Sequence, residues 1–408
     1  MSNKKNFYFI TRRDFLKAAG AVTATAAVSP LLSACGGGGP TTGPLKIGVL
    51  LPFSDIYAVL GESITEAMRL YFEENNNEAG GRKIELIVED TEIKPDVAQQ
   101  RARKLIEEDE VAFVTGIVSS GVLAGLRDYF VETEKLLLCS NAGANALSRA
   151  AKTPYIWRTS FTNWMAPHSM GTWAAENVGK KAIISVPDYG AGHDNVAAFT
   201  NSFEATGGEI LPTQLTPFPN MGDPAPFMAE LADSGADMVY SFYSGGAAVT
   251  FVQAYADFGL EIPLLCAGFM VEQDVLPAQG QTALGVRSTL HWALPLENAE
   301  NDALKTAFSE KVGREADVFA VQGHDTARVI VEMLNRVEGD TSDVNKMIEA
   351  LDGISFDSPR GPFALDANSQ APRHKMYLRE VQDVGGVVQN TVTADLGEVV
   401  DPGDDSMG

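Results

Sequence analysis

Short apolar runs alternate with amphipathic runs along the chain from Leu45 onward. Helical spacing follows the first apolar run, where Ile64, Ala67 and Met68 recur on one face, and the glycines at 80 and 81 predict the end of this helix. A second helix is expected to begin near Pro95. The apolar runs predict strands at 45–52, 82–90, 111–118 and 135–142. Strands that alternate with helices are typical of a mainly parallel sheet covered by helices on both faces.

A second series of the same kind begins after residue 163. Its predicted strands are at 181–188, 208–215, 237–244 and 262–268. Two open α/β units in one chain predict two lobes that face a cleft. Ligands of such sheets bind outside the carboxyl ends of the strands, so the residues that follow each strand are the candidate site.

The N-terminal apolar segment Ala18–Leu32 has 15 residues and contains Pro30. A membrane-spanning helix needs about 20 apolar residues, so this segment is too short and fits the core of an export signal. The preceding "TRRDFLK" resembles a twin-arginine signal, and "LSAC" resembles a lipobox whose Cys35 becomes lipidated. We therefore interpret 1–34 as signal peptide and 35–44 as a glycine-rich tether. The alternative is an uncleaved amphipathic N-terminus.

The net charge excludes some partners. The whole chain has 54 acidic and 31 basic residues and a formal charge of −23. Loss of the signal removes five basic residues and one acid, which leaves 53 acidic and 26 basic side chains and a charge of −27. So acidic a protein is not expected to bind nucleic acid or an anionic membrane surface. Cys139 and Cys266 lie in separate apolar runs and are expected to be buried free thiols rather than a disulfide.

Known enzyme motifs are missing from the sequence. We find no P-loop, no G-x-S-x-G elbow and no metal-ligand spacing among the five histidines. Asp325 precedes an apolar helical run, "TARVIVEML", and is interpreted as its N-cap rather than as a base. The sequence therefore predicts no catalytic residue, no metal site and no cofactor.

Two loops after neighbouring predicted strands favour a carboxylate ligand. "GIVSSG" at 116–121 precedes a helix, and "SNAGA" at 140–144 has the same small, polar character. Backbone N–H groups and hydroxyls at a helix N-terminus are suited to an anion. Ordinary Gly/Ser turns are the alternative for either loop alone.

The order of these segments resembles the leucine/isoleucine/valine-binding family of solute-binding proteins. The resemblance rests on "GRKIELIVED", "VAFVTGIVSSGVLAGL", "KLLLCSNAGANALS", "PYIWRTS", "DYGAGHDN", "GADMVYSFYSGG" and "VFAVQGHDTARVIVEML", and it covers about residues 45–366. It implies the type I periplasmic binding protein fold, with two Rossmann-like lobes joined by three hinge crossovers near 158–163, 286–294 and 354–362. Lobe 1 would comprise 45–159 plus 292–354, and lobe 2 would comprise 160–291 plus 355–408.

The resemblance also implies site residues. They are expected after the strands of both lobes and in the last loop that enters the cleft. The expected ligand-binding residues are Tyr57, Leu60, Ser119, Ser120, Ala142, Gly143, Ala144, Trp164, Tyr189, Tyr243, Ser244, Gly245, Phe269, Phe319 and Gln322. Six of these are aromatic, and we expect two of the six to belong to the lobe cores instead.

One departure from the family pattern bears on the ligand. Phe269 stands where amino-acid receptors of the family place an acid that pairs with the ligand's ammonium group. A buried ammonium must be paired, so the expected ligand is a small organic carboxylate with an uncharged body, such as an aromatic acid. Glu272 could replace the missing acid if the loop register is shifted, and the ligand would then be an amino acid or amide.

The resemblance implies an exported receptor of an ABC importer, on the periplasmic or cell-surface face of the membrane. Its partners would be the ligand and the permease subunits, and lipidated Cys35 would hold it at the membrane. A sensor that does not serve transport is a further alternative.

Overall fold

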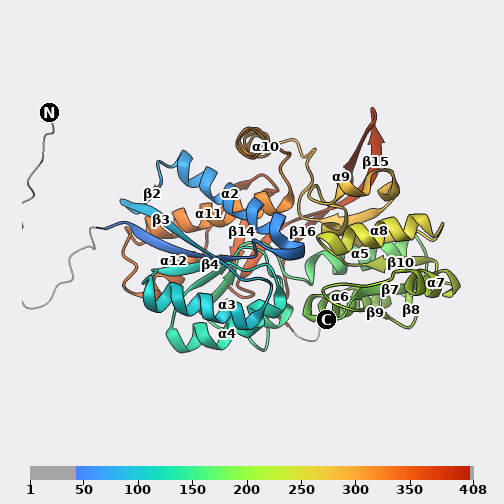
Figure 1. Cartoon of the computed structure of the whole chain (residues 1–408), viewed down its shortest axis with the longest axis horizontal. Helices are drawn as coiled ribbons and strands as arrows, with labels where there is room; N and C mark the ends of the chain where they lie inside the picture. The colour runs from blue at the N-terminus through green and yellow to red at the C-terminus, as the bar shows by residue number, and fades with distance from the viewer. Residues whose placement is uncertain (1–42, 405–408) are drawn as a thin grey trace, which may run out of the picture. The chain divides into compact units, whose positions relative to one another are not determined.

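The computed structural model describes residues 43–404, and every structural statement below concerns these residues (Figure 1). The predicted export signal at 1–34, the predicted lipidation residue Cys35 and residues 36–42 of the predicted tether lie outside the described part of the chain. Among the residues described, no helix combines the length and the apolar character that crossing a membrane requires. Cys139 and Cys266 are both buried and free, as predicted.

The first sheet has six strands in the order β2-β3-β1-β4-β5-β6. All neighbours are parallel except β2 and β3. The strands are β1 (Leu45–Leu51), β2 (Glu78–Ala79), β3 (Arg82–Asp90), β4 (Phe113–Gly116), β5 (Leu137–Cys139) and β6 (Ile156–Arg158). Each apolar run that the sequence analysis predicted here forms a strand.

Helices cover both faces of the first sheet. Residues of β1 alternate between two cores: Ile47, Val49 and Leu51 pack in one, while Leu50 packs in the other. The helices are α2 (Ala58–Glu74), α3 (Pro95–Arg103), α4 (Ser120–Thr133), α10 (Ala299–Val312), α11 (Val318–Arg336) and α12 (Val344–Leu351). Short turns η1 (Asp55–Tyr57), η2 (Lys104–Glu108) and η3 (Asn145–Ser148) join them. In Figure 1, α2 and α11 lie on one side of this sheet and α3 and α4 on the other.

The second sheet has ten strands. Eight follow the order β13-β14-β15-β12-β11-β10-β7-β8, while β16 pairs with β15 and β9 pairs with β7. The strands are β7 (Lys181–Pro187), β8 (Glu209–Ile210), β9 (Gln214–Thr216), β10 (Met238–Ser241), β11 (Leu264–Ala267), β12 (Arg287–Leu290), β13 (Ser355–Ser358), β14 (Gly361–Asp366), β15 (Ala371–Val384) and β16 (Val387–Val399). The last four form an antiparallel extension of an otherwise parallel sheet.

The helices of the second sheet follow its strands, except α5, which precedes β7. They are α5 (Met165–Asn177), α6 (Gly190–Ala205), α7 (Ala225–Asp233), α8 (Gly246–Asp257) and α9 (Leu276–Gln279), with short turns η4 (Gly268–Val271) and η5 (Gly280–Ala283). The single strand predicted at 208–215 is wrong, because the chain forms β8 and β9 on either side of Pro212. Proline has no N–H to donate, so it interrupts the hydrogen-bonded ladder.

Helix α11 begins earlier than the sequence predicted. Its N-cap is Asp317, whose Oδ1 accepts a hydrogen bond from the backbone N–H of Ala320 at 2.8 Å. Asp325 lies in the second turn and is not an N-cap, and Phe319 and Gln322 lie in the helix rather than in a loop.

Helices α2 and α11 touch at their backbones. Gly323 makes this possible, because a Cβ at this position would lie 2.2 Å from the carbonyl oxygen of Ile64. The two helices begin close to the candidate site, with Leu60 in the first turn of α2 and Phe319 in the first turn of α11.

Candidate functional site

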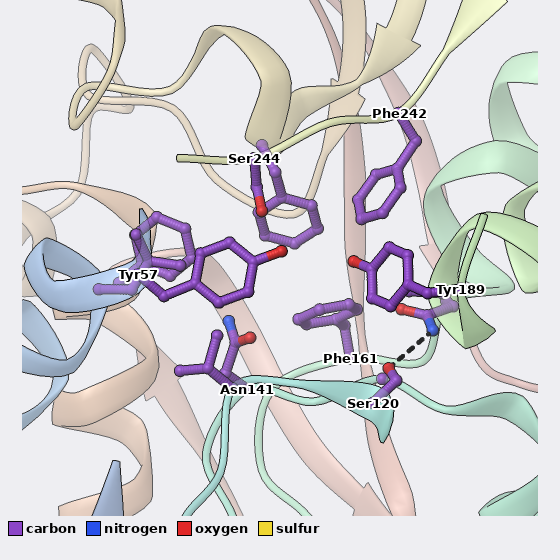
Figure 2. A pocket seen from close by; sticks show the side chains of 14 residues that line it. Tyr57, Ser120, Asn141, Phe161, Tyr189, Phe242 and Ser244 are labelled. Carbon is purple, nitrogen blue, oxygen red and sulfur yellow. Dashed lines mark hydrogen bonds between the residues drawn. The ribbon is translucent and has the colours of Figure 1, made fainter. Parts of the chain in front are cut away.

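The candidate site is a pocket where loops from the carboxyl ends of both sheets meet (Figure 2). The loops after β1, β4, β5 and β6 contribute from the first sheet, and those after β7, β10 and β11 contribute from the second. The pocket is narrow, and its empty space of about 330 Å³ includes space open to solvent. This is the position that an open α/β sheet predicts for a ligand.

Eight of the fifteen predicted site residues line this pocket. They come from both sheets and from α11. These residues are Tyr57, Leu60, Ser120, Gly143, Tyr189, Ser244, Phe269 and Phe319.

Four predicted residues near the first sheet lie outside the lining. Ser119 is the N-cap residue of α4, and its neighbour Ser120 faces the pocket instead. Ala142 donates its N–H to the carbonyl of Ile117, and the carbonyl of Ala144 accepts from Arg158, so both belong to the loop framework. The fourth, Gln322, is buried behind the pocket.

Three further residues also lie outside the lining. Trp164 stacks on His168, with ring centroids 4.0 Å apart. The hydroxyl of Tyr243 is 2.9 Å from that of Thr216, so its ring turns into the core of the second sheet. Gly245 has a φ of 58° and begins α8, where a Cβ would lie 2.3 Å from the carbonyl oxygen of Ile56.

Six lining residues were not predicted. Each lies within three positions of a predicted residue in the same loop, so the loops were identified but not the side chains that face inward. These six are Val118, Asn141, Phe161, Asn163, Ala191 and Phe242. Asn141 and Asn163 are polar residues directly beside predicted site residues in these loops, and this position was the signal that sequence reasoning could have used.

Six of the fourteen described lining residues are aromatic. The ring centroid of Phe269 is 4.8 Å from that of Phe161, 6.5 Å from that of Phe242 and 6.0 Å from that of Phe319. Rings at these separations attract one another through their edges and faces. The wall therefore offers a flat ring-sized ligand several aromatic partners.

Three hydroxyl groups meet at one end of the pocket. The hydroxyl of Tyr57 interacts with those of Ser244 and Tyr189, and Figure 2 shows all three directed toward the same space. Burial raises the pKa of Tyr57 and raises that of Tyr189 well above its ordinary value. These phenols therefore stay protonated near neutral pH and can donate hydrogen bonds.

Neutral amides and a hydroxyl form the other end. Asn163 Nδ2 donates to Ser120 Oγ at 3.2 Å and to Asp194 Oδ2 at 2.8 Å, and the N–H of Asn145 donates to the same carboxylate oxygen at 3.0 Å. Burial raises the pKa of Asp194, although these hydrogen bonds oppose the shift. Ser120 is the first residue of α4, so the helix N-terminus also faces this end.

Among the described residues that line the pocket, none is charged. Glu272, the alternative partner for a ligand ammonium, is engaged elsewhere: its Oε2 lies 2.6 Å from Nη1 of Arg379, and both side chains are fully buried. Arg379 also donates to the carbonyls of Gly268 and Trp292, at 2.9 Å each. Glu272 therefore fixes the loop after β11 and is not available to a ligand in this structure.

A polar network begins directly behind the pocket. Asn141 Nδ2 donates to Oε1 of Gln322 at 2.6 Å, and Nε2 of Gln322 is 3.4 Å from Nε2 of His291. The ring of His291 stacks on that of His374 at 4.8 Å. A lining residue is thus connected to side chains from β15 and from the segment after β12.

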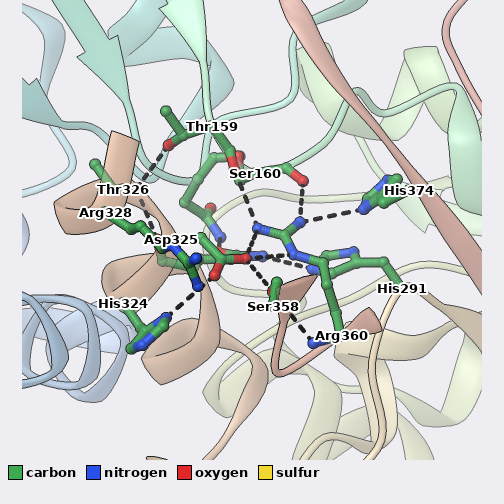
Figure 3. A network of polar contacts seen from close by, with 12 residues as sticks. Thr159, Ser160, His291, His324, Asp325, Thr326, Arg328, Ser358, Arg360 and His374 are labelled. Carbon is green, nitrogen blue, oxygen red and sulfur yellow. Dashed lines mark hydrogen bonds and ion pairs between the residues drawn. The ribbon is translucent and has the colours of Figure 1, made fainter. Parts of the chain in front are cut away.

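Arg360 is the centre of this network (Figure 3). Its guanidinium is 2.6 Å from Asp325 Oδ2 and donates to the carbonyls of Thr159 and Ser160 at 3.1 and 2.7 Å. It also lies 3.1 Å from Nδ1 of His374. The network therefore joins the segment after β6 to the segment between β13 and β14 and to α11.

The environment shifts the titration of these groups. Burial alone would raise the pKa of Asp325, but the charge of Arg360 and hydrogen bonds from His324 and Ser358 outweigh it and lower this pKa. Burial, followed by the charge of Arg360, lowers the pKa of both His291 and His374 well below the ordinary value. Asp325 is therefore charged and both histidines are neutral near pH 7.

Comparison with known proteins identifies the family. The family model for periplasmic binding proteins matches residues 44–386. The chain belongs to the periplasmic binding protein family. This is a family of solute-binding proteins rather than of enzymes, and it accounts for two α/β lobes with a pocket between their loops.

Solved structures of other solute-binding proteins are similar to this chain. One, from R. palustris in complex with benzoate, is 35% identical with a TM-score of 0.84, covering 89% of this chain and 99% of that protein. Another, from R. palustris in complex with 4-hydroxybenzoate, is 30% identical with a TM-score of 0.84, covering 88% and 99%. A Leu/Ile/Val-binding protein homolog of Brucella melitensis is 30% identical over 83% of this chain and 87% of its own length.

The same comparison identifies the N-terminal signal. Residues 10–29 match the signal sequence of the twin-arginine translocation pathway. With the family, this signal indicates export to the periplasm. Within residues 43–404, no group of three or more His, Cys, Asp or Glu side chains is arranged to hold a metal ion.

Proposed function

We propose that this periplasmic binding protein is the receptor of an ABC importer for a small aromatic monocarboxylate. The observation that carries the proposal is the pocket itself: aromatic walls, neutral hydrogen-bond donors at both ends, and no charged side chain among its described lining residues. Such a site matches a flat ligand whose body is uncharged. The proposal includes no catalytic step.

The carboxylate is proposed to bind at the end formed by Ser120 and Asn163. A helix N-terminus stabilises an anion by about 0.3–1 kcal/mol, and the Ser120 hydroxyl, which accepts from Asn163, can donate a further hydrogen bond to a charged acceptor. The α4 N-terminus begins at Ser120 and supplies these groups together. The benzoate and 4-hydroxybenzoate complexes of the two R. palustris proteins support the same ligand class.

An amino-acid ligand is the second candidate, supported by the Leu/Ile/Val-binding name of the Brucella relative. Its ammonium group would need a carboxylate partner, since an unpaired buried charge costs several kcal/mol. Glu272 is already paired with Arg379. The aromatic acid is therefore the better candidate.

We further propose that closure occurs by bending at the three crossovers, between lobe 1 (45–159 plus 292–354) and lobe 2 (160–291 plus 355–408). Contacts between loops of the two sheets support this, since Asp194 of α6 accepts from Asn145 and Gly245 abuts Ile56. Ligand contacts with both lobes would stabilise the closed form that the permease recognises. A sensing role without transport is the alternative for the closed form.

Lipid anchoring through Cys35 belongs to the same proposal. The "LSAC" sequence and the glycines after it are its support. Metabolic labelling with a fatty-acid analogue should mark the wild-type protein and not Cys35→Ser. Equal labelling of both would refute the anchor without affecting the ligand proposal.

Calorimetric titration with benzoate, 4-hydroxybenzoate and leucine tests the ligand class. We expect both aromatic acids to bind and leucine not to bind. Gly143→Ala should lower the affinity for the acids by about 5- to 150-fold, because overpacking costs about 1–3 kcal/mol. A Cβ there would lie 2.5 Å from Asn163 Oδ1 and 2.6 Å from a ring carbon of Phe161.

Gly190→Ala is the matched control for this substitution. A Cβ at residue 190 would meet no atom within 4 Å, so the same chemical change should leave the affinity unchanged. Tight leucine binding without aromatic-acid binding would replace the proposal with the amino-acid receptor.

A further inference from the structure

A second cavity lies behind the hydroxyl end of the ligand pocket. It is smaller than the pocket, with about 270 Å³ of empty space that includes space open to solvent, and it shares three lining residues with the pocket: Tyr57, Tyr189 and Ser244. The rest of its wall is largely apolar and includes Pro187, Phe218, Met221 and Ala247. Among the described residues, these three shared side chains lie between the two spaces.

Tyr189 is the main part of this partition. Its ring stacks on that of Phe218, which lines the second cavity, at 4.1 Å and an interplanar angle of 9°. It is also roughly parallel to Phe242 of the ligand pocket, at 6.5 Å and 21°. One ring from each cavity therefore faces the same tyrosine.

Weak interactions hold this ring in place. Its hydroxyl interacts with that of Tyr57, and its backbone precedes Gly190 at the start of α6. The ring is half-buried, so a smaller side chain at this position would remove stacking contacts rather than a fully buried core group.

The chemistry of the second cavity restricts what it could accept. None of its described lining residues is charged, and the hydroxyl of Tyr243 is already within 3.3 Å of Ser185 and 2.9 Å of Thr216. The remaining surface is apolar and aromatic, which suits an uncharged ring or hydrocarbon chain.

We propose that Tyr189 sets the length of ligand that the site accepts, and that the second cavity is a subsite which the tyrosine ring closes. This inference rests on the proposed binding of aromatic carboxylates. With Tyr189 in place, the site holds acids with a single ring. Without the ring, the two spaces join, and a ligand whose carboxylate lies at Ser120 extends into the second cavity.

Calorimetric titration of benzoate and biphenyl-4-carboxylate into the purified protein tests the inference. We expect the wild type to bind benzoate at least 100-fold more tightly than the biphenyl acid. Tyr189→Ala should raise the affinity for the biphenyl acid at least tenfold and lower that for benzoate. Phe258→Ala is the matched control, because this aromatic residue is 46% exposed at the far end of α8 and should change neither affinity.

Filling the second cavity provides an independent test of the inference. Ala247→Phe added to Tyr189→Ala should abolish the gained affinity for the biphenyl acid. If Tyr189→Ala does not melt cooperatively, Tyr189→Leu serves in its place, with a smaller gain expected in the same direction.

The outcomes separate the two proposals. Equal wild-type affinity for both acids, or folded Tyr189 variants with no gain for the biphenyl acid, would overturn the role of Tyr189 while leaving the aromatic receptor intact. Failure of the wild type to bind benzoate or any other aromatic acid would overturn the proposed function itself.

Discussion

The ligand pocket and the network around Arg360 are adjacent, buried and rich in aromatic or imidazole rings, yet they differ in charge. The described lining of the pocket is neutral throughout. The network holds the fully buried ion pair Asp325–Arg360, and Glu272–Arg379 is buried nearby. Charge is thus used where segments from different parts of the chain must be fixed to one another.

This difference has a physical reason. A buried charge without a partner is very costly, so an ion pair strongly favours the arrangement in which both partners meet. In a binding pocket the same cost would apply whenever the ligand leaves. Neutral donors avoid it, because solvent can replace the ligand at each hydrogen bond. The pocket can therefore empty and refill, whereas the network is suited to remain intact.

Breaking the ion pair is expected to have the largest effect. Asp325→Asn should lower the free energy of unfolding by about 3–5 kcal/mol, because it leaves the Arg360 charge buried without its partner. Urea unfolding measures this change. Asp128→Asn is the control, since this carboxylate is 81% exposed and its loss should not alter the unfolding midpoint. A loss below 1 kcal/mol for Asp325→Asn would show that the network does not stabilise the fold.

The pH dependence of the unfolding free energy tests the same comparison between the pocket and the network. His291 and His374 have lowered pKa values in the folded protein, so the unfolded chain binds more protons below about pH 6.5. Stability is therefore fully present above that pH and is lost as the pH falls, by up to about 1.4 kcal/mol per pH unit for each histidine.

Substitution of one histidine isolates its share of this effect. Urea unfolding between pH 5 and 7.5, about the range over which histidine titrates, gives the slope of the unfolding free energy against pH. His374→Gln should reduce this slope by the equivalent of about one bound proton. His193→Gln is the control, because its side chain is 55% exposed. An unchanged slope for His374→Gln would mean that this histidine does not stay neutral in the fold.

The smallest effect is expected within the neutral pocket. Tyr57→Phe removes one of the three hydroxyl groups that Tyr57, Tyr189 and Ser244 place at one end of the pocket. It should weaken the binding of 4-hydroxybenzoate by about 2- to 12-fold, the equivalent of about 0.5–1.5 kcal/mol, and change benzoate binding less. Calorimetry with both acids measures the ratio, and Tyr155→Phe makes the same change outside the pocket. An equal loss of affinity for both acids would show that Tyr57 contributes by packing rather than by a hydrogen bond to the ligand's hydroxyl group.

Much of the fold could be predicted because most of the parallel strands contain a local apolar run, although the parallel strands β6 and β12 were missed. The runs around Ile47, Val114 and Ile184 all formed strands, whatever their partners. The antiparallel strands β13–β16 gave no such signal: β14 and β15 expose alternate residues, and their pairing depends on contacts far along the chain. The early start of α11 was missed because its N-cap, Asp317, precedes a run that was interpreted as a loop.

The loops that form the candidate pocket could be predicted from the sequence, but the side chains that line it could not all be predicted. Strand ends located Ser120 and Gly143, whereas their neighbours Ser119 and Ala142 turn away from the pocket. Which side chain of a loop points inward depends on the other segments packed against it. The buried ion pairs could not be predicted for the same reason. Glu272 and Arg379 are 107 positions apart, and no local sequence pattern indicates their contact.

The close contact of α2 and α11 has a consequence for how the site adapts to different ligands. With Gly323 against Ile64, the two helices cannot slide past each other without a backbone clash, so Leu60 and Phe319 form one stiff boundary. Adjustment to ligand shape is then left to the opposite boundary, where Tyr189 and Phe242 lie on loops after β7 and β10. Substitutions that change the ligand preference of this protein should therefore concentrate around Tyr189 and Phe242.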